Sequence, residues 1–176
     1  MVVRLAPRTV PSNKAPQPSA ADRLMRLLDY LDPALIDLHL QGEDKEQILA
    51  NLVGLLASRG KIEHRDALLE SLMEREGLGS TGIGHGVAIP HGRCRELAAP
   101  AIAFARSEHE VDFDSIDGLP TRIFFLLVAP ENGGNEHLHL LAKIARLMRD
   151  SATREQLLAI DSNDQVLELF NAREPA

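Results

Sequence analysis

The run from Ile123 to Val128 constrains the fold more than any other stretch, because all six of its residues are apolar. A strand with one buried face alternates apolar and polar residues, whereas a strand buried on both faces has no polar side. The apolar run is far shorter than the roughly 20 residues that cross a bilayer. The sequence therefore predicts a central strand of a sheet in a protein without membrane insertion.

Two further segments are predicted to be strands. Ala101 to Ala105 is a short, mostly apolar run. Leu35 to Gln41 alternates apolar and polar residues, which is typical of a strand with one buried face. In that alternation His39 is expected to face solvent.

Apolar residues at helical spacing predict five helices, over residues 43–58, 63–76, 135–149, 152–159 and 163–172. Gly60 and Gly77 supply stops for the first two, and Asn135 is a candidate N-cap for the third. The residues expected on the buried side of the third helix are Leu138, Leu141, Ile144, Ala145 and Met148. Helices at both ends and strands in the middle predict an α/β fold, a mixed β-sheet flanked by helices.

Length and composition favour one cytoplasmic domain. Residues 1–21 are rich in proline and are expected to form a disordered tail, so the domain is predicted over 22–176. The net charge of −7 argues against nucleic acid as a partner. Cys94 is the single cysteine and cannot form an internal disulfide, and no N-terminal run is typical of a signal peptide.

The stretch from Ser80 to Arg93 reads S-T-G-I-G-H-G-V-A-I-P-H-G-R and concentrates glycine, proline and histidine. A nucleotide-phosphate loop would need G-x-G-x-x-G opening a helix, or G-K-[ST]. Here the glycines are spaced G-x-G-x-G and are followed by Val-Ala-Ile-Pro, which cannot open a helix. No bound nucleotide is therefore expected.

A metal site is one hypothesis, because His85, His91, His137 and His139 could supply four imidazoles. Residues two apart on a helix point about 200° apart, so His137 and His139 cannot both reach one ion unless their segment is extended. This leaves zinc as a minority hypothesis, and no metal is expected. Hydrolysis by a nucleophilic serine or cysteine is not predicted, because no G-x-S-x-G elbow occurs and nothing marks Cys94 as an activated thiolate.

Histidine itself remains as a candidate nucleophile. A neutral imidazole that is exposed and held in one orientation can accept a phosphoryl group. Around His91, Pro90 stiffens the chain and Gly92 leaves room beside the ring. A packed, hydrogen-bonded His91 without catalytic function is the alternative, and the residues alone favour the phosphohistidine hypothesis only modestly.

Arg75 and His137 are candidates to contact the phosphoryl group. Arg75 shares the apolar stripe of Leu68 and Leu72 near a helix end, where it either neutralises the helix C-terminus or points into a site. His137 precedes Ile144 at core spacing and so faces inward from a helix N-terminus, where the dipole favours anions. A lone histidine in such a place is more often structural than catalytic.

The segment from Ser80 to Arg93 resembles the signature of the type-2 enzyme IIA domain of the bacterial phosphoenolpyruvate-dependent phosphotransferase system, the fructose/mannitol/nitrogen-regulatory group. Three further stretches resemble the same family: L-M-E-R-E-G-L-G-S, V-D-F-D-S-I-D-G-L-P and E-H-L-H-L-L-A-K-I-A-R-L. Together they cover roughly residues 34–172. The resemblance implies the mixed-sheet fold of that family.

The resemblance also implies roles for individual residues. His91 would be the acceptor, as a tele-phosphohistidine, of a phosphoryl group from HPr or its nitrogen-branch relative. Arg75 and His137 would line the phosphoryl pocket, and His139 is not the matching histidine. No metal, nucleotide or other cofactor is implied. His85 stands where nitrogen-type members usually have asparagine, either as a second titratable group near the pocket or, as we favour, as a neutral variation.

Three functions follow from this resemblance. The first is a nitrogen-type regulatory phosphoryl carrier, since the signature is most similar to that subgroup and no IIB or IIC segment is found in these residues. The second is the soluble IIA component of a fructose- or mannitol-type sugar uptake system, which passes phosphate to a IIB cysteine. The third is a binding module without phosphotransfer, against which the retention of Arg75, His91 and His137 argues.

Overall fold

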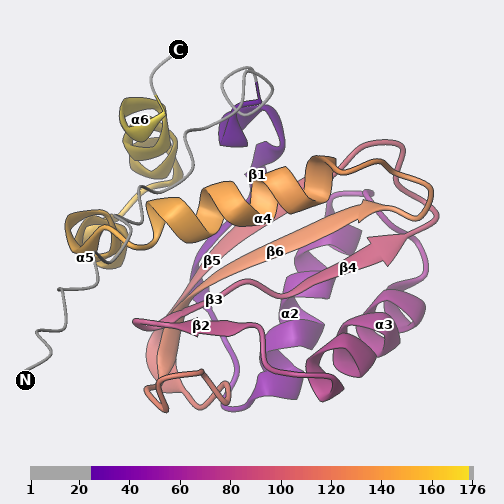
Figure 1. Cartoon of the computed structure of the whole chain (residues 1–176), viewed down its shortest axis with the longest axis horizontal. Coiled ribbons are helices and arrows are strands. Elements are labelled where there is room, and N and C mark those ends of the chain that lie inside the picture. Colours follow the sequence, from indigo (N-terminus) through magenta and orange to yellow (C-terminus); the bar gives the residue numbers. More distant parts are fainter. Residues whose placement is uncertain (1–24, 175–176) are drawn as a thin grey trace, which may run out of the picture.

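A computed structural model describes residues 25–174, which form three layers with a six-stranded sheet in the middle (Figure 1). The predictions for the proline-rich tail and for the start of the domain at residue 22 lie outside the described residues. The strands are β1 (Leu31–Leu40), β2 (Gly82–Gly84), β3 (Val87–Ala88), β4 (His91–Cys94), β5 (Ala101–Val111) and β6 (Thr121–Pro130). The helices are η1 (Leu27–Asp29, a 3-10 turn), α2 (Lys45–Ser58), α3 (Arg65–Gly77), α4 (Glu136–Leu147), α5 (Ser151–Ala159) and α6 (Asn163–Arg173).

The sheet is mixed, as predicted, in the order β1-β5-β6-β3-β2, with β4 also paired to β6. Strand β6 runs antiparallel to β5 and parallel to β3 and β4. The predicted central run lies within β6, whose residues 123–129 are buried. Strand β4 continues the edge that β3 begins, so among the described residues it pairs with β6 alone.

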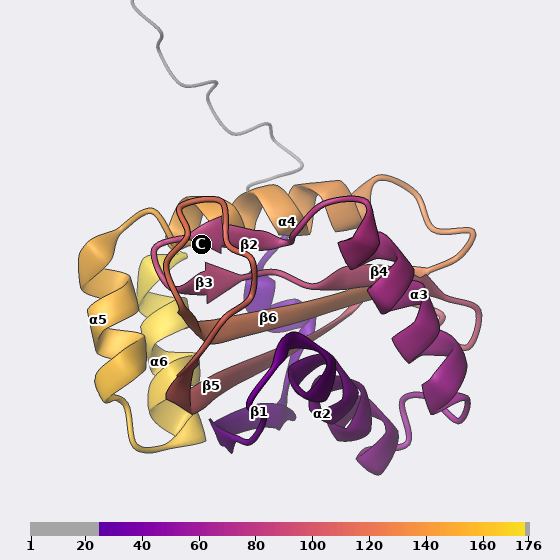
Figure 2. The ribbon, with the colours of Figure 1, turned by 90° about the horizontal axis from the view of Figure 1, so that it is seen from below.

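Two hydrophobic cores lie on opposite faces of the sheet, and β6 contributes to both. Phe124, Leu126 and Val128 point into the core shared with α2 and α3. Phe125 and Leu127 belong to the core shared with α4, α5 and α6. Figure 2 shows the sheet between these two helical layers. This alternation explains why the β6 sequence has no polar side.

The predicted helices are confirmed, with ends that shift by up to two residues. One prediction on α4 was wrong: Leu138 is 55% exposed, whereas Leu140, which we had not placed inside, is fully buried. The buried stripe is Leu140, Ile144 and Met148, and Leu141 and Ala145 pack partly buried beside it. The stripes that begin at Leu138 and at Leu140 both have helical spacing, so periodicity alone did not show which of the two is buried.

The strands show larger differences from the prediction. Strand β1 begins at Leu31, and β5 continues to Val111 through the polar residues 107–110, where alternation gave no signal. Strands β2, β3 and β4 were not predicted, because two to four residues are too few for a period to be visible. His39 is exposed, as predicted. None of the helices between residues 25 and 174 has the length and apolar character needed to span a membrane.

Candidate active site

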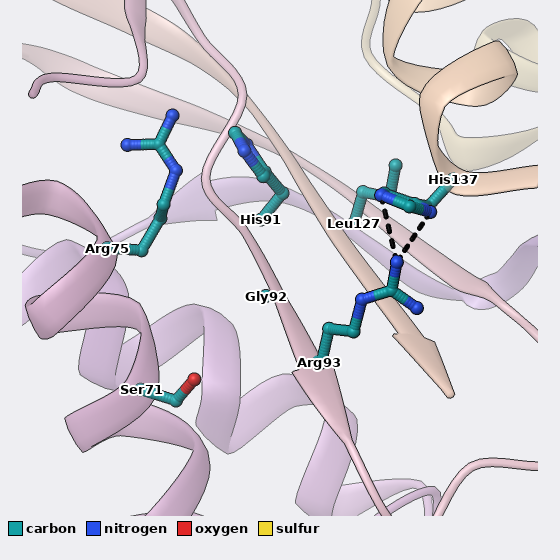
Figure 3. Close-up of a pocket in the computed structure, with 7 residues that line it drawn as sticks. All are labelled: Ser71, Arg75, His91, Gly92, Arg93, Leu127 and His137. Carbon is teal, nitrogen blue, oxygen red and sulfur yellow. Dashed lines mark hydrogen bonds between the residues drawn. The ribbon is translucent and has the colours of Figure 1, made fainter. Parts of the chain in front are cut away.

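A pocket of about 240 Å³ lies beside the β4 edge of the sheet, between α3 and the start of α4 (Figure 3). It is lined by Ser71, Arg75, His91, Gly92, Arg93, Leu127 and His137. Strand β4 brings His91 opposite Leu127 of β6 in register. The structure thus brings together all three residues that the sequence singled out, from three separate elements.

The ring of His91 is held by the chain segment just before β4. Its Nδ1 lies 2.8 Å from the main-chain oxygen of Ile89, two residues earlier. A carbonyl oxygen only accepts, so Nδ1 carries the hydrogen and Nε2 keeps its lone pair. The half-buried ring therefore presents Nε2 as its nucleophilic atom.

The surroundings of His91 favour its neutral form. Burial lowers the pKa of His91 below its ordinary value of 6.5, and the charges of Arg75 and His137 lower it further. The hydrogen bond to Ile89 and the nearby Glu76 carboxylate act in the opposite direction without cancelling this shift. At neutral pH the imidazole is therefore uncharged and able to attack phosphorus.

The position of Arg75 is compatible with both hypotheses made from the sequence. It lies in the last turn of α3, and its Nη1 donates to the oxygen of Gly79 at 3.0 Å, just past the helix end. It also lines the pocket beside His91. One guanidinium thus caps the chain after the helix and contributes positive charge to the site.

Glu76, next to Arg75, supports the site from behind. Its carboxylate is buried and accepts hydrogen bonds from the Thr81 main-chain nitrogen and the Thr81 hydroxyl. Lys45 of α2 also donates to it, at 3.2 Å. These contacts tie the end of α3 to the chain that enters β2. Sequence reasoning missed Glu76, because a lone glutamate on a helix is usually solvated.

His137 lies in the first turn of α4, and its ring lines the pocket. Its Nδ1 lies 3.2 Å from the oxygen of Gly134, which can only accept. Asn135 occupies the N-cap position, as predicted, but its side chain makes no capping bond. The reason is its backbone: φ −84° and ψ 5° are far from the extended conformation that aims a capping side chain at the helix.

Arg93 is a pocket residue that sequence reasoning missed. Its Nη1 donates to the oxygens of Pro130 and Gly133, at 3.0 and 3.2 Å. Its Nη2 lies 3.1 Å from the His137 ring nitrogens, as the dashed lines in Figure 3 mark. Arg93 lies on the same face of β4 as His91, but a strand of four residues is too short for this alternation to be visible in the sequence.

The other histidines of the metal hypothesis do not line this pocket. His85 is exposed at the β2–β3 turn with φ 56°, a left-handed conformation in which asparagine and histidine are both enriched. Its main-chain nitrogen donates to Asp117 at 2.8 Å, so the position is defined by backbone geometry. Within residues 25–174, no group of three or more His, Cys, Asp or Glu side chains is arranged to hold a metal ion.

Comparison with known proteins identifies the family. The family model described as phosphoenolpyruvate-dependent sugar phosphotransferase system, EIIA 2, matches residues 29–173. The chain belongs to this family. Type-2 EIIA proteins are phosphoryl carriers of the phosphotransferase system, and a pocket built around a neutral histidine suits that chemistry.

Relatives of this type-2 EIIA protein fall into two groups. It is 42% identical over 135 residues to a nitrogen regulatory protein of Bradyrhizobium diazoefficiens, covering 77% of this chain and 88% of that one. It is 36% identical over 147 residues to the fructose-specific EIIABC component of Bacillus subtilis, covering 84% of this chain but only 23% of that protein. Among solved structures, the nitrogen regulatory protein IIA-Ntr of Neisseria meningitidis has a TM-score of 0.76 at 35% identity, covering 81% of this chain and 97% of that one.

Proposed function

We propose that His91 accepts a phosphoryl group on Nε2 from the phosphohistidine of an HPr-like carrier protein. The observation that carries the proposal is the contact between His91 Nδ1 and the Ile89 oxygen, which leaves Nε2 with its lone pair in the pocket. Arg75 and His137 flank this atom and would contact the transferred group. His91 would thereby become a tele-phosphohistidine in a cytoplasmic protein.

The step conserves atoms and charge without a cofactor. The Nε2 lone pair of His91 forms a new N–P bond while the N–P bond of the donor breaks, and the bonding pair returns to the donor nitrogen. The hydrogen of His91 stays on Nδ1 and is donated to the Ile89 oxygen throughout. Since one phosphohistidine is exchanged for another, the protein needs only to position the group and stabilise its charge.

We further propose that the phosphorylated and unphosphorylated forms regulate a target protein, as a nitrogen-type EIIA. The similarity to the nitrogen regulatory proteins of Bradyrhizobium diazoefficiens and Neisseria meningitidis supports this use. A soluble sugar-uptake component is the second candidate, supported by 36% identity to the fructose-specific EIIA component of Haloferax volcanii. In that case a IIB cysteine would receive the phosphoryl group.

The acceptor is tested by incubating the protein with phosphoenolpyruvate, enzyme I and the HPr-like carrier. We expect one acid-labile phosphate per chain, absent in His91→Ala and retained in the matched control His139→Ala, which lies outside the pocket. Undiminished labelling of His91→Ala would overturn the assignment.

The two downstream functions are separated by a second step. The labelled protein is mixed with a purified fructose-type IIB domain, and the phosphate is followed by acid lability and mass spectrometry. Retention of the label on His91 favours the regulatory function, whereas rapid movement to the IIB cysteine favours sugar uptake.

A further inference from the structure

We propose that Arg93 is a second phosphoryl-binding cation of the site and also positions His137, an inference that rests on the proposed function of His91. Arg93 and His91 are two residues apart in β4, so their side chains leave the strand on the same face. Both line the same pocket. A phosphoryl group on His91 would therefore be within the reach of a long guanidinium side chain.

The guanidinium has one fixed end and one exchangeable end. Nη1 donates to two main-chain oxygens, Pro130 and Gly133, which hold the group at the pocket rim. Nη2 has no carbonyl partner and contacts only the His137 ring among the described contacts. Nη2 can therefore turn to a phosphoryl oxygen while Nη1 remains anchored.

The contact with Arg93 also defines the resting state of His137. Nδ1 of His137 must donate to the Gly134 oxygen, so it cannot accept from Arg93 as well. The Nη2 atom of Arg93 is 3.1 Å from both ring nitrogens, so it lies over the ring rather than on the in-plane lone pair of one nitrogen. Arg93 thus orients His137 before the phosphoryl group arrives.

The charges in the pocket call for two cations. A phosphoryl group carries about −1.5 to −2 charges at pH 7. Arg75 alone, with one positive charge, would leave much of that charge unbalanced. The buried Glu76 carboxylate is already paired with Lys45. Arg93 supplies the second positive charge, so the pocket matches the charge of a phosphoryl dianion.

On phosphorylation, one contact of Arg93 is exchanged. The contact between Nη2 and the His137 ring is lost, and an Nη2–H group donates to a phosphoryl oxygen, so no proton leaves Arg93. The His137 ring is released by this exchange, and the loop 131–135 remains held by Nη1.

The variants that test this inference are Arg93→Gln, Arg93→Lys and the matched control Arg95→Gln. Arg95 carries the same charge two residues further along and pairs with Glu131 of the same loop, but its side chain is 85% exposed and lies outside the pocket. The proteins are phosphorylated both by the HPr-like carrier and chemically by phosphoramidate, whose N–P bond breaks with release of ammonia. Thermal unfolding verifies that each variant is folded.

We expect Arg93→Gln to accept the phosphoryl group about tenfold to a hundredfold more slowly, with partial recovery in Arg93→Lys and no change in Arg95→Gln. A nearby cation favours the dianion, so the ³¹P resonance of phosphorylated Arg93→Gln should titrate at higher pH than in wild type and Arg95→Gln. The ring resonances of His137 should shift in unphosphorylated Arg93→Gln but not in Arg95→Gln, because Arg93 contacts that ring.

The outcomes distinguish this inference from the function on which it rests. If wild type is labelled at His91 and Arg93→Gln matches Arg95→Gln in rate and ³¹P titration, Arg93 has only a structural role and the inference is overturned. If neither the carrier nor phosphoramidate labels His91, the proposed function fails and the inference fails with it.

Discussion

The Nδ1 atom of His91 lies 2.8 Å from the main-chain oxygen of Ile89, with Pro90 between the two residues. This contact fixes which nitrogen carries the hydrogen, because a carbonyl oxygen cannot donate. Proline has no main-chain N–H and holds φ near −65°, which stiffens the short loop of chain that the hydrogen bond closes. The nucleophile is thus oriented by the chain segment that carries it.

The first prediction concerns pH. Burial and the charges of Arg75 and His137 lower the pKa of His91, so the rate of phosphoryl acceptance should hold as the pH falls through 6.5 and decline only below it. NMR titration of the His91 ring gives the same midpoint directly. A midpoint at or above 6.5 would contradict the proposed environment.

The lowered pKa of His91 extends this first prediction to the stability of the fold. The folded-state pKa lies below the unfolded value, so between the two the unfolded chain binds more protons at His91. The contribution of His91 to stability is therefore lost as the pH falls from 6.5 through the folded pKa. Relative to wild type, His91→Gln should lose less stability across this range in urea unfolding at matched pH values.

A second prediction concerns Arg75. Removing its charge in Arg75→Gln should move the His91 titration upward toward 6.5 without reaching it, because burial is the larger cause of the lowered pKa. We expect acceptance to be about tenfold to a hundredfold slower. Arg59→Gln, whose native side chain donates to the Ala34 oxygen outside the pocket, serves as the control. An unchanged His91 titration in Arg75→Gln would show that the two groups do not interact.

The buried carboxylate of Glu76 gives a third prediction. Glu76→Gln removes the buried one of the two carboxylates that pair with Lys45, and we expect it to destabilise the protein by about 3 kcal/mol. The His91 titration should move further down, because the Glu76 carboxylate raises that pKa. Asp114→Asn removes the other, exposed partner of Lys45 and should cost less than about 1 kcal/mol. Equal losses in the two variants would contradict the structural role of Glu76.

The close approach of α3 to β4 gives a fourth prediction. A Cβ added at Gly92 would lie 3.0 Å from Leu72 Cδ2, and Leu72 is fully buried. Gly92→Ala should therefore destabilise the protein by about 1 to 3 kcal/mol and displace α3 with Arg75. A Cβ at Gly77, on the same helix, meets nothing within 4 Å, so Gly77→Ala should be neutral or slightly stabilising. Chemical unfolding and the rate of acceptance measure both effects.

The two leucines of α4 give a fifth prediction. Leu140→Ala should cost about 2 to 5 kcal/mol, because its side chain is fully buried in the core shared with α5 and α6. Leu138→Ala, on the exposed side of the same helix, should change stability by less than about 0.5 kcal/mol. The reverse ranking in urea unfolding would show that the helix face was assigned wrongly.

Strong periodic signals were predictable from the sequence, and contacts between distant segments were not. The apolar run of β6 and the helical stripes led to the mixed sheet and its flanking helices. The face of α4 was less certain, because Leu138 and Leu140 both fit a helical period. Only the packed core determines which of them lies inside.

In the site, too, local features were predictable from the sequence, and contacts between distant segments were not. His91, Arg75 and His137 were singled out from local chemistry and a resemblance, and the structure brings them to one pocket. Arg93 and Glu76 were not predicted, because their partners lie 31 or more residues away or in the irregular segment after α3. A buried carboxylate or an anchored guanidinium is recognised by its partners, which periodicity does not reveal.

Leu127 forms part of the pocket wall while the adjacent residues of β6 fill the core on the opposite face. A strand bonded to neighbours on both sides and packed above and below has little freedom to shift. A negative charge gained at His91 would then be accommodated at the rim of the pocket, by the side chains of Arg75, Arg93 and His137. We expect any protein that distinguishes the phosphorylated from the unphosphorylated form to contact this rim and not the buried wall beneath it.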